Sequence, residues 1–145
     1  MKLSEQNRTT LLTQLHKSIE DSANIIANNI NDGQTSDLIN YPPNGGLTEE
    51  EMNSLKSLAG NEVLRNTLRK VLASNSATVI FELFNIIDGT SDPDPEIGEW
   101  SEVMLVDQPD DFDDYSEFLH DNFYETYWNW RKKRIANYKL DLLED

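Results

Sequence analysis

The sequence predicts a mainly α-helical protein, a single-domain helical bundle over residues 1–145 with a small β element near residues 99–107. Three observations favour this fold class. Apolar residues recur at spacings of three and four over long stretches, and residues typical of helix starts and stops flank several of these stretches. The length of 145 residues also suits one domain with a core of its own.

The first predicted helix runs from about Ser4 to Asn31. Its apolar residues fall on one face, and Asn31-Asp32-Gly33 is a plausible end because glycine is favoured just past a helix. The segment from Asp32 to Gly46 is polar and includes Tyr41–Gly46, whose two prolines and two glycines predict a loop. The apolar face comprises Leu12, Leu15, Ile19, Ala23, Ile26 and Ile30.

The next helix has the clearest local start signal. Thr48 and Glu51 have the spacing of a capping box, in which each side chain satisfies the other's backbone N–H, and Gly60 is expected to end the helix. Asn61 then caps a further helix that finishes near Ser74.

The apolar stretch Ser76–Asp88 is ambiguous. Its β-branched residues favour a strand, whereas the helical spacing of its apolar residues, with Ser76 as cap and Gly89 as stop, favours a buried helix, which we expect. Glu99–Asp107 is predicted as a short strand, and Asp114 to Leu140 as a last helix in which Asp114 and Glu117 repeat the capping pattern.

The net charge of −15 is concentrated in one block. Between Val71 and Trp130 there are 15 acids and no Lys or Arg, while the remaining chain has 12 acids and 12 bases. Such a block repels nucleic acids and anionic membranes and attracts basic partners. Acidic loops that merely keep a protein soluble are the plainer interpretation of the same pattern.

Several functional classes are disfavoured by what the sequence lacks. Without cysteine, the chain has no thiolate chemistry, disulfides or cysteine-ligated metals. Its first residues lack the apolar run of a signal peptide, and no stretch is expected to span a bilayer, so we expect a cytoplasmic protein without cofactors.

The loop Asp88–Glu99 has oxygen-bearing groups at the spacing of an EF-hand calcium loop. Pro93 stands at the place that requires glycine, and a strand is predicted where the exit helix belongs, so an acidic turn is favoured over a metal site. Glu117 and His120 form half of a di-iron motif that has no second copy.

Aromatic residues precede a basic run, Arg131-Lys132-Lys133-Arg134. This combination occurs in nucleic-acid binding proteins, but the run is short and lies next to the acidic block. We therefore interpret the basic run as an intramolecular counterweight to the acids and expect no nucleic-acid binding.

Two segments, Leu83–Pro93 and Leu119–Tyr124, carry a resemblance to known proteins. They are similar to stretches of small, acidic, uncharacterised bacterial proteins of the immunity type, which are encoded beside polymorphic toxins. The two segments comprise 17 of the 145 residues, and the resemblance includes no diagnostic motif. It implies a protein that neutralises a toxin by binding it.

The resulting hypothesis is a non-enzymatic binding protein whose acidic surface engages a basic protein partner. Carboxylates would steer the encounter and exposed aromatic residues would anchor it. The alternative is a small enzyme or ligand-binding domain that uses Asp88, Asp92 and His120 near an aromatic pocket. The predicted partner-binding residues are Asp88, Asp92, Asp94, Glu96, Glu99, Trp100, Asp110, Asp111, Phe112, Asp113 and Asp114.

Overall fold

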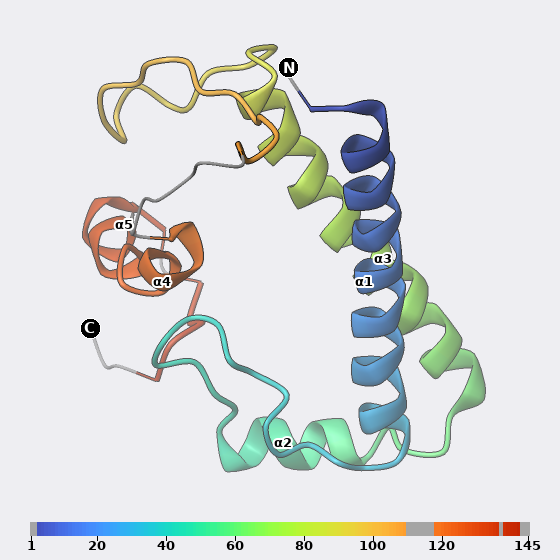
Figure 1. The fold of residues 1–145 in the computed structure, drawn as a ribbon. Helices are drawn as coiled ribbons and strands as arrows, with labels where there is room; N and C mark the ends of the chain where they lie inside the picture. Colours follow the sequence, from blue (N-terminus) through green and yellow to red (C-terminus); the bar gives the residue numbers. More distant parts are fainter. Residues whose placement is uncertain (1–2, 110–117, 137, 143–145) are drawn as a thin grey trace. The chain divides into compact units, whose positions relative to one another are not determined.

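The computed structural model describes residues 3–109, 118–136 and 138–142, and it is mainly helical, as predicted (Figure 1). The chain forms two compact units. Of the described residues, 3–28 and 62–109 belong to unit 1 and the others to unit 2. The expectation that the chain is a single domain stays a prediction. The helices are α1 (Glu5–Asn31), α2 (Glu49–Lys56), α3 (Glu62–Ile87), α4 (Leu119–Phe123) and α5 (Tyr127–Lys133).

Helix α1 confirms the first predicted helix to within one residue. Its end has the two hydrogen bonds of a Schellman motif: Gly33 N–H donates to the Ile30 carbonyl at 3.1 Å and Gln34 N–H to the Asn29 carbonyl at 2.8 Å. Gly33 has a φ of +70°, which explains why glycine stands there.

Helix α3 confirms the helical prediction for Ser76–Asp88 but corrects the boundary before it. One helix continues through Ser74–Ser76, where two were predicted. These residues are only moderate helix formers, yet neither glycine nor proline interrupts the chain, and the Thr78 hydroxyl donates to the Ser74 carbonyl within the helix. A second Schellman motif at Gly89 ends α3, as predicted.

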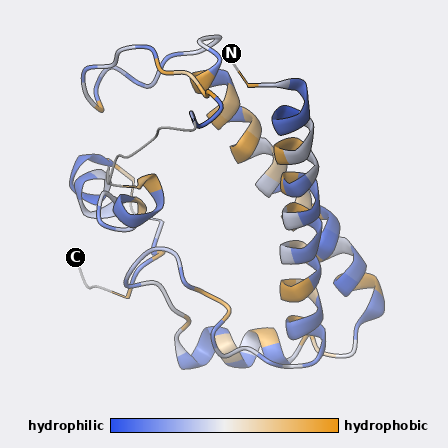
Figure 2. Ribbon diagram, in the orientation of Figure 1, coloured by the Kyte–Doolittle hydropathy of each residue, from blue (hydrophilic) through white to orange (hydrophobic). Residues whose placement is uncertain are grey.

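The second half of α3 is apolar on several sides and is not covered. The expected burial is wrong: Val79, Phe81 and Leu83 are 58%, 65% and 51% exposed, and no residue described in α3 is buried. Figure 2 shows the hydrophobic residues near the C-terminal end of this helix. By length and composition α3 could cross a membrane, with a mean hydropathy of 1.2 over an 18-residue stretch, so the expectation that no stretch qualifies does not hold. Glu82 and Asn85 interrupt the apolar run.

Helix α2 confirms the predicted capping box. Glu51 N–H donates to Thr48 Oγ1 at 3.3 Å, and Thr48 N–H donates to Glu51 Oε2 at 2.7 Å. The hydrogen bond from the Thr48 backbone, followed by that from its hydroxyl, lowers the pKa of Glu51 from its ordinary value. The chain then turns at Gly60, which has a φ of +75°.

The predicted long helix from Asp114 to Leu140 is wrong for the described residues. Two short helices, α4 and α5, stand in its place, and the predicted cap at Asp114 and Glu117 lies outside the described residues. The chain leaves α5 at Arg134 in an extended conformation with a ψ of 137°. It then returns to the loop after α1, where Leu142 N–H donates to the Asn44 carbonyl at 3.0 Å.

The strand predicted for Glu99–Asp107 is also wrong. The segment is irregular, and the described residues form no sheet in which it could take part. A strand requires hydrogen bonds from a neighbouring strand, so the alternation of apolar residues in this segment is not sufficient to produce one.

Candidate functional site

The carboxylates of unit 1 are concentrated in one stretch of chain, Glu82–Asp107, here called the acidic segment. No Lys or Arg occurs in it, and the predicted binding residues Asp88, Asp92 and Trp100 lie within it and are exposed, as are Asp94, Glu96 and Glu99. The predicted residues Asp110, Asp111, Phe112, Asp113 and Asp114 lie outside the described residues.

The middle of the acidic segment is shaped by its own turn. Asp94 accepts hydrogen bonds from two backbone N–H groups, that of Glu96 at its side chain (2.9 Å) and that of Ile97 at its carbonyl (2.9 Å). In the described part of the chain, no group of three or more His, Asp or Glu side chains is placed to hold a metal ion. The residues Asp92, Glu96 and Glu99 beside it are exposed.

Asp107 ties the end of the acidic segment to the start of α1. Its carboxylate accepts from the Asn7 side-chain amide at 2.8 Å and from Ser4 N–H at 3.2 Å. The hydrogen bond from Asn7 is the main cause of a lowered Asp107 pKa. A carboxylate at a helix N-terminus is also favoured by the helix dipole. The segment is thus attached to α3 at one end and to α1 at the other.

Helices α1 and α3 are antiparallel, and an apolar groove lies between them. The Arg69 guanidinium donates to Asn28 Oδ1 at 3.4 Å near one end of the pair, whereas the groove lies between the N-terminal half of α1 and the C-terminal half of α3. It has a volume of about 500 Å³. Its lining consists of Leu12, Leu15, His16 and Ile19 from α1 and Ser74, Ala77, Thr78, Ile80, Phe81 and Phe84 from α3.

The acidic segment also packs at the end of α3 that borders this groove. A smaller hollow of about 170 Å³ lies between Ile87–Gly89 and Glu102–Leu105. Because Phe84 in the groove is one helical turn from Asp88 in the hollow, carboxylates and apolar lining form neighbouring parts of unit 1.

The alternative pocket of Asp88, Asp92 and His120 stays a prediction. The two aspartates belong to unit 1 and His120 to unit 2. The His120 side chain is 81% exposed, with Nε2 3.2 Å from Asp121 Oδ1 and the ring stacked on Phe118 at 5.6 Å between centroids.

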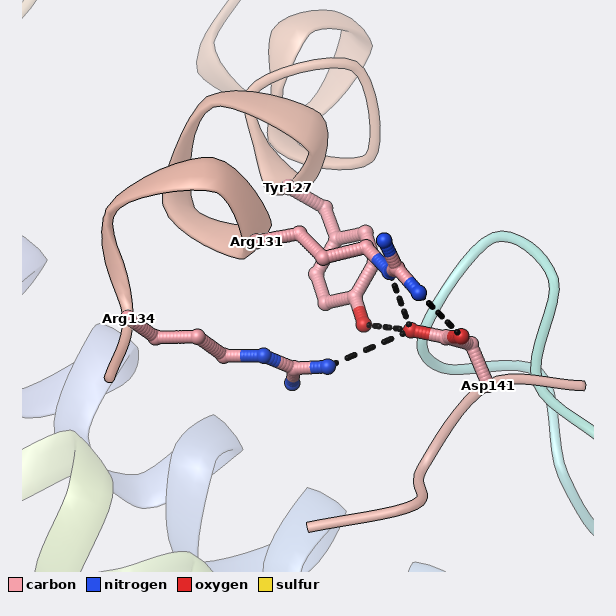
Figure 3. Close-up of polar contacts among 4 residues, drawn as sticks. All are labelled: Tyr127, Arg131, Arg134 and Asp141. Atoms are coloured by element: carbon pink, nitrogen blue, oxygen red, sulfur yellow. Dashed lines mark hydrogen bonds and ion pairs between the residues drawn. The ribbon is translucent and has the colours of Figure 1, made fainter. Parts of the chain in front are cut away.

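Two arginines of the basic run contact a buried carboxylate of the C-terminal tail. In unit 2, Asp141 is 3% exposed and accepts from Tyr127 Oη at 2.5 Å, Arg131 Nε at 3.0 Å and Arg134 Nη2 at 3.4 Å (Figure 3). Arg134 also lies over the Tyr127 ring, 5.8 Å from its centroid. Within the described part of the chain, the two arginines pair with a carboxylate of the C-terminal tail.

This cluster is buried and joins α5 to the tail. Burial, and then the hydrogen bond to Asp141, raises the pKa of Tyr127 above its ordinary value. The aromatic surroundings extend to Tyr41, whose ring lies 5.6 Å from that of Tyr127 and 5.9 Å from that of Phe123. Asp141 thus accepts from three side chains of the cluster, while Arg134 Nη1 is buried without a hydrogen-bond partner among the described residues.

Comparison of the chain with family models, with curated proteins and with solved structures gives no match. The functional interpretation therefore depends on the two features of unit 1, the acidic segment and the groove.

Proposed function

We propose that this protein is a non-enzymatic binding protein whose acidic segment engages a basic protein partner, in its most concrete form an immunity-type inhibitor that neutralises a toxin by binding it. The observation that supports this proposal is the uncompensated charge. From Glu82 to Asp107 the chain carries eight carboxylates, all exposed except the half-buried Asp107, and no base.

The physical role of these carboxylates is to accelerate and select the encounter. Clustered charges of one sign raise association rates by about 10- to 1,000-fold at low ionic strength, and this gain decreases as salt screens the field. Trp100, 43% exposed within the same segment, supplies an aromatic surface of the kind that anchors interfaces.

The test compares the wild type with a variant that neutralises three carboxylates of the segment, Asp92→Asn, Glu99→Gln and Glu102→Gln. A matched control removes the same charge elsewhere, by Glu49→Gln, Glu50→Gln and Glu125→Gln. Tagged full-length proteins capture partners from the native host in low salt, and association rates are then measured with the purified partner.

We expect one basic protein to be recovered in stoichiometric amount by the wild type and by the control. The segment variant should associate about 10-fold more slowly, and the difference should vanish at high salt. Recovery of no stoichiometric partner, or equal slowing in both variants, would refute the proposal.

A further inference from the structure

The second half of α3 has the composition of a helix that is covered on more than one side. A helix that is apolar all round is typical of a protein core, whereas one packed on a single neighbour carries one apolar stripe. Ile80 and Phe84 line the groove beside α1, while Val79 and Leu83 are exposed elsewhere on the same half. The described residues of unit 1 leave this apolar surface open.

The groove has the form that accepts a third helix. Leu12, Leu15 and Ile19 on α1 and Ala77, Ile80 and Phe84 on α3 follow spacings of three and four, so each helix presents a ridge along the groove. A volume of about 500 Å³ between two such ridges accommodates several side chains of a further helix.

The charge around the groove selects among occupants. From Val71 to Asp107 the chain holds acids and no base, and the bases of α3 precede the groove-lining residues. On α1, Arg8 and Lys17 lie near the lining residues together with Glu5, Glu20 and Asp21, so the negative field comes from the acidic segment rather than from α1. A second copy would bring the same net charge of −15 against itself, and an anionic membrane would be repelled as well. A cationic amphipathic occupant gains from both the apolar lining and the field of the neighbouring acidic segment.

We propose that the groove between α1 and α3 binds a cationic amphipathic helix presented by the basic partner. This inference rests on the proposed function and names the binding mode at the same part of unit 1. The apolar face of the incoming helix contacts Leu15, Ile80 and Phe81, and its Lys or Arg side chains extend over the acidic segment beyond Phe84.

The experiment titrates the full-length protein with a synthetic peptide of about 18 residues, roughly five helical turns, with Leu on one face and Lys on the other. A matched peptide carries Glu in place of each Lys. Phe81→Ala removes a groove residue that is 65% exposed, and Val79→Ala removes an apolar residue that is 58% exposed on the opposite side of the same helical turn. Both variants should fold like the wild type because neither side chain is buried.

The Lys peptide should bind the wild type and Val79→Ala equally, become helical on binding, and bind Phe81→Ala at least about 10-fold more weakly. The Glu peptide should not bind. Equal binding of the Lys peptide to both variants would refute the groove, while capture of a basic partner by the acidic segment would still stand. If the two variants bind the Lys peptide equally and the acidic segment captures no basic partner, both proposals are refuted.

Three other outcomes would contradict the proposal that the groove binds a cationic helix. Binding of the Glu peptide as tightly as the Lys peptide would remove the charge argument. A concentration-dependent dimer that Phe81→Ala abolishes, measured by sedimentation, would assign the groove to a second copy. Co-sedimentation with neutral phosphatidylcholine vesicles that depends on Phe81 would assign it to a lipid surface.

Discussion

Replacing Asp141 with asparagine tests how much the buried cluster of unit 2 contributes to folding. The substitution keeps the size of the side chain and removes its charge. Its carboxylate is 3% exposed and faces two guanidinium groups, that of Arg134 at 5% exposure and that of Arg131 at 25%. Without the carboxylate, at least one buried positive charge has no counter-ion.

The expected loss of unfolding free energy is about 3 kcal/mol. Removing one partner of a buried ion pair costs about 3–5 kcal/mol, because the remaining charge stays desolvated. The lower end of this energy range applies here because Arg131 retains part of its hydration. Asparagine also still offers one oxygen to Tyr127 Oη, which in the wild type lies 2.5 Å from the carboxylate.

The assay is urea unfolding followed by tryptophan fluorescence. Trp128 and Trp130 lie on α5, so a Trp100→Phe background makes the signal specific for unit 2. The matched control is Asp121→Asn, an exposed carboxylate beside His120, which should change the unfolding free energy by less than about 0.5 kcal/mol.

A second variant separates a stranded charge from lost packing. Adding Arg134→Met to Asp141→Asn removes the buried cation, so the double variant should be less destabilised than the sum of the two single variants. Unfolding free energies of Asp141→Asn and Asp121→Asn that differ by less than about 0.5 kcal/mol would contradict a stabilising role of the buried ion pair.

Three further predictions concern single hydrogen bonds. Thr48→Ala should cost about 1 kcal/mol in urea unfolding through loss of the α2 cap, and an unchanged midpoint would contradict the cap's role. Because the Asp107 pKa is lowered, the hydrogen bond from Asn7 to its carboxylate should persist above pH 3.8 and be lost as the pH falls through the folded-state pKa. The side-chain amide resonances of Asn7 should shift in this pH range, and Asp107→Asn should abolish the shift. Because the Tyr127 pKa is raised, its contribution to stability should be complete below pH 10.0 and lost as the pH rises through the folded-state pKa, and Tyr127→Phe should remove this alkaline loss in thermal unfolding.

Helix starts and stops could be predicted because their signals are local. Thr48 and Glu51 lie three residues apart and satisfy each other's backbone within one turn. Gly33 and Gly89 end α1 and α3 by adopting a positive φ that other residues avoid. Each of these features depends on a few consecutive residues, so no knowledge of the tertiary structure is needed.

The sequence predictions were wrong where contacts between residues distant in sequence determine the structure. The chain after α5 is extended, with Arg134 held by Asp141, a contact that helical spacing does not reveal. Asp107 meets Ser4 across 103 positions of sequence, which no pattern near either residue indicates. The segment before Asp107 alternates like a strand but has no partner among the described residues.

The negative charge of the candidate site could be predicted from the sequence, whereas the groove between α1 and α3 could not. Composition alone located the acidic block, because it is a property of residue types. The apolar stripe of α1 was predicted as well, including Leu12, Leu15 and Ile19, but was interpreted as core. A stripe shows that a helix face is suited to burial, whereas only the structure shows whether the chain itself covers that face.

The one boundary wrongly predicted within α3 coincides with a change in the role of that helix. Before Ser74, α3 carries Arg65, Arg69 and Lys70 and is bonded to α1 through Arg69 and Asn28. From Ser74 onward it lines the groove, and Glu82 is its only charged residue. The polar residues Ser74–Ser76 therefore lie where the helix changes from its charged first half to the apolar half that lines the groove. On this basis substitutions of packed residues in the first half should act on folding, and those of exposed residues in the second half on binding.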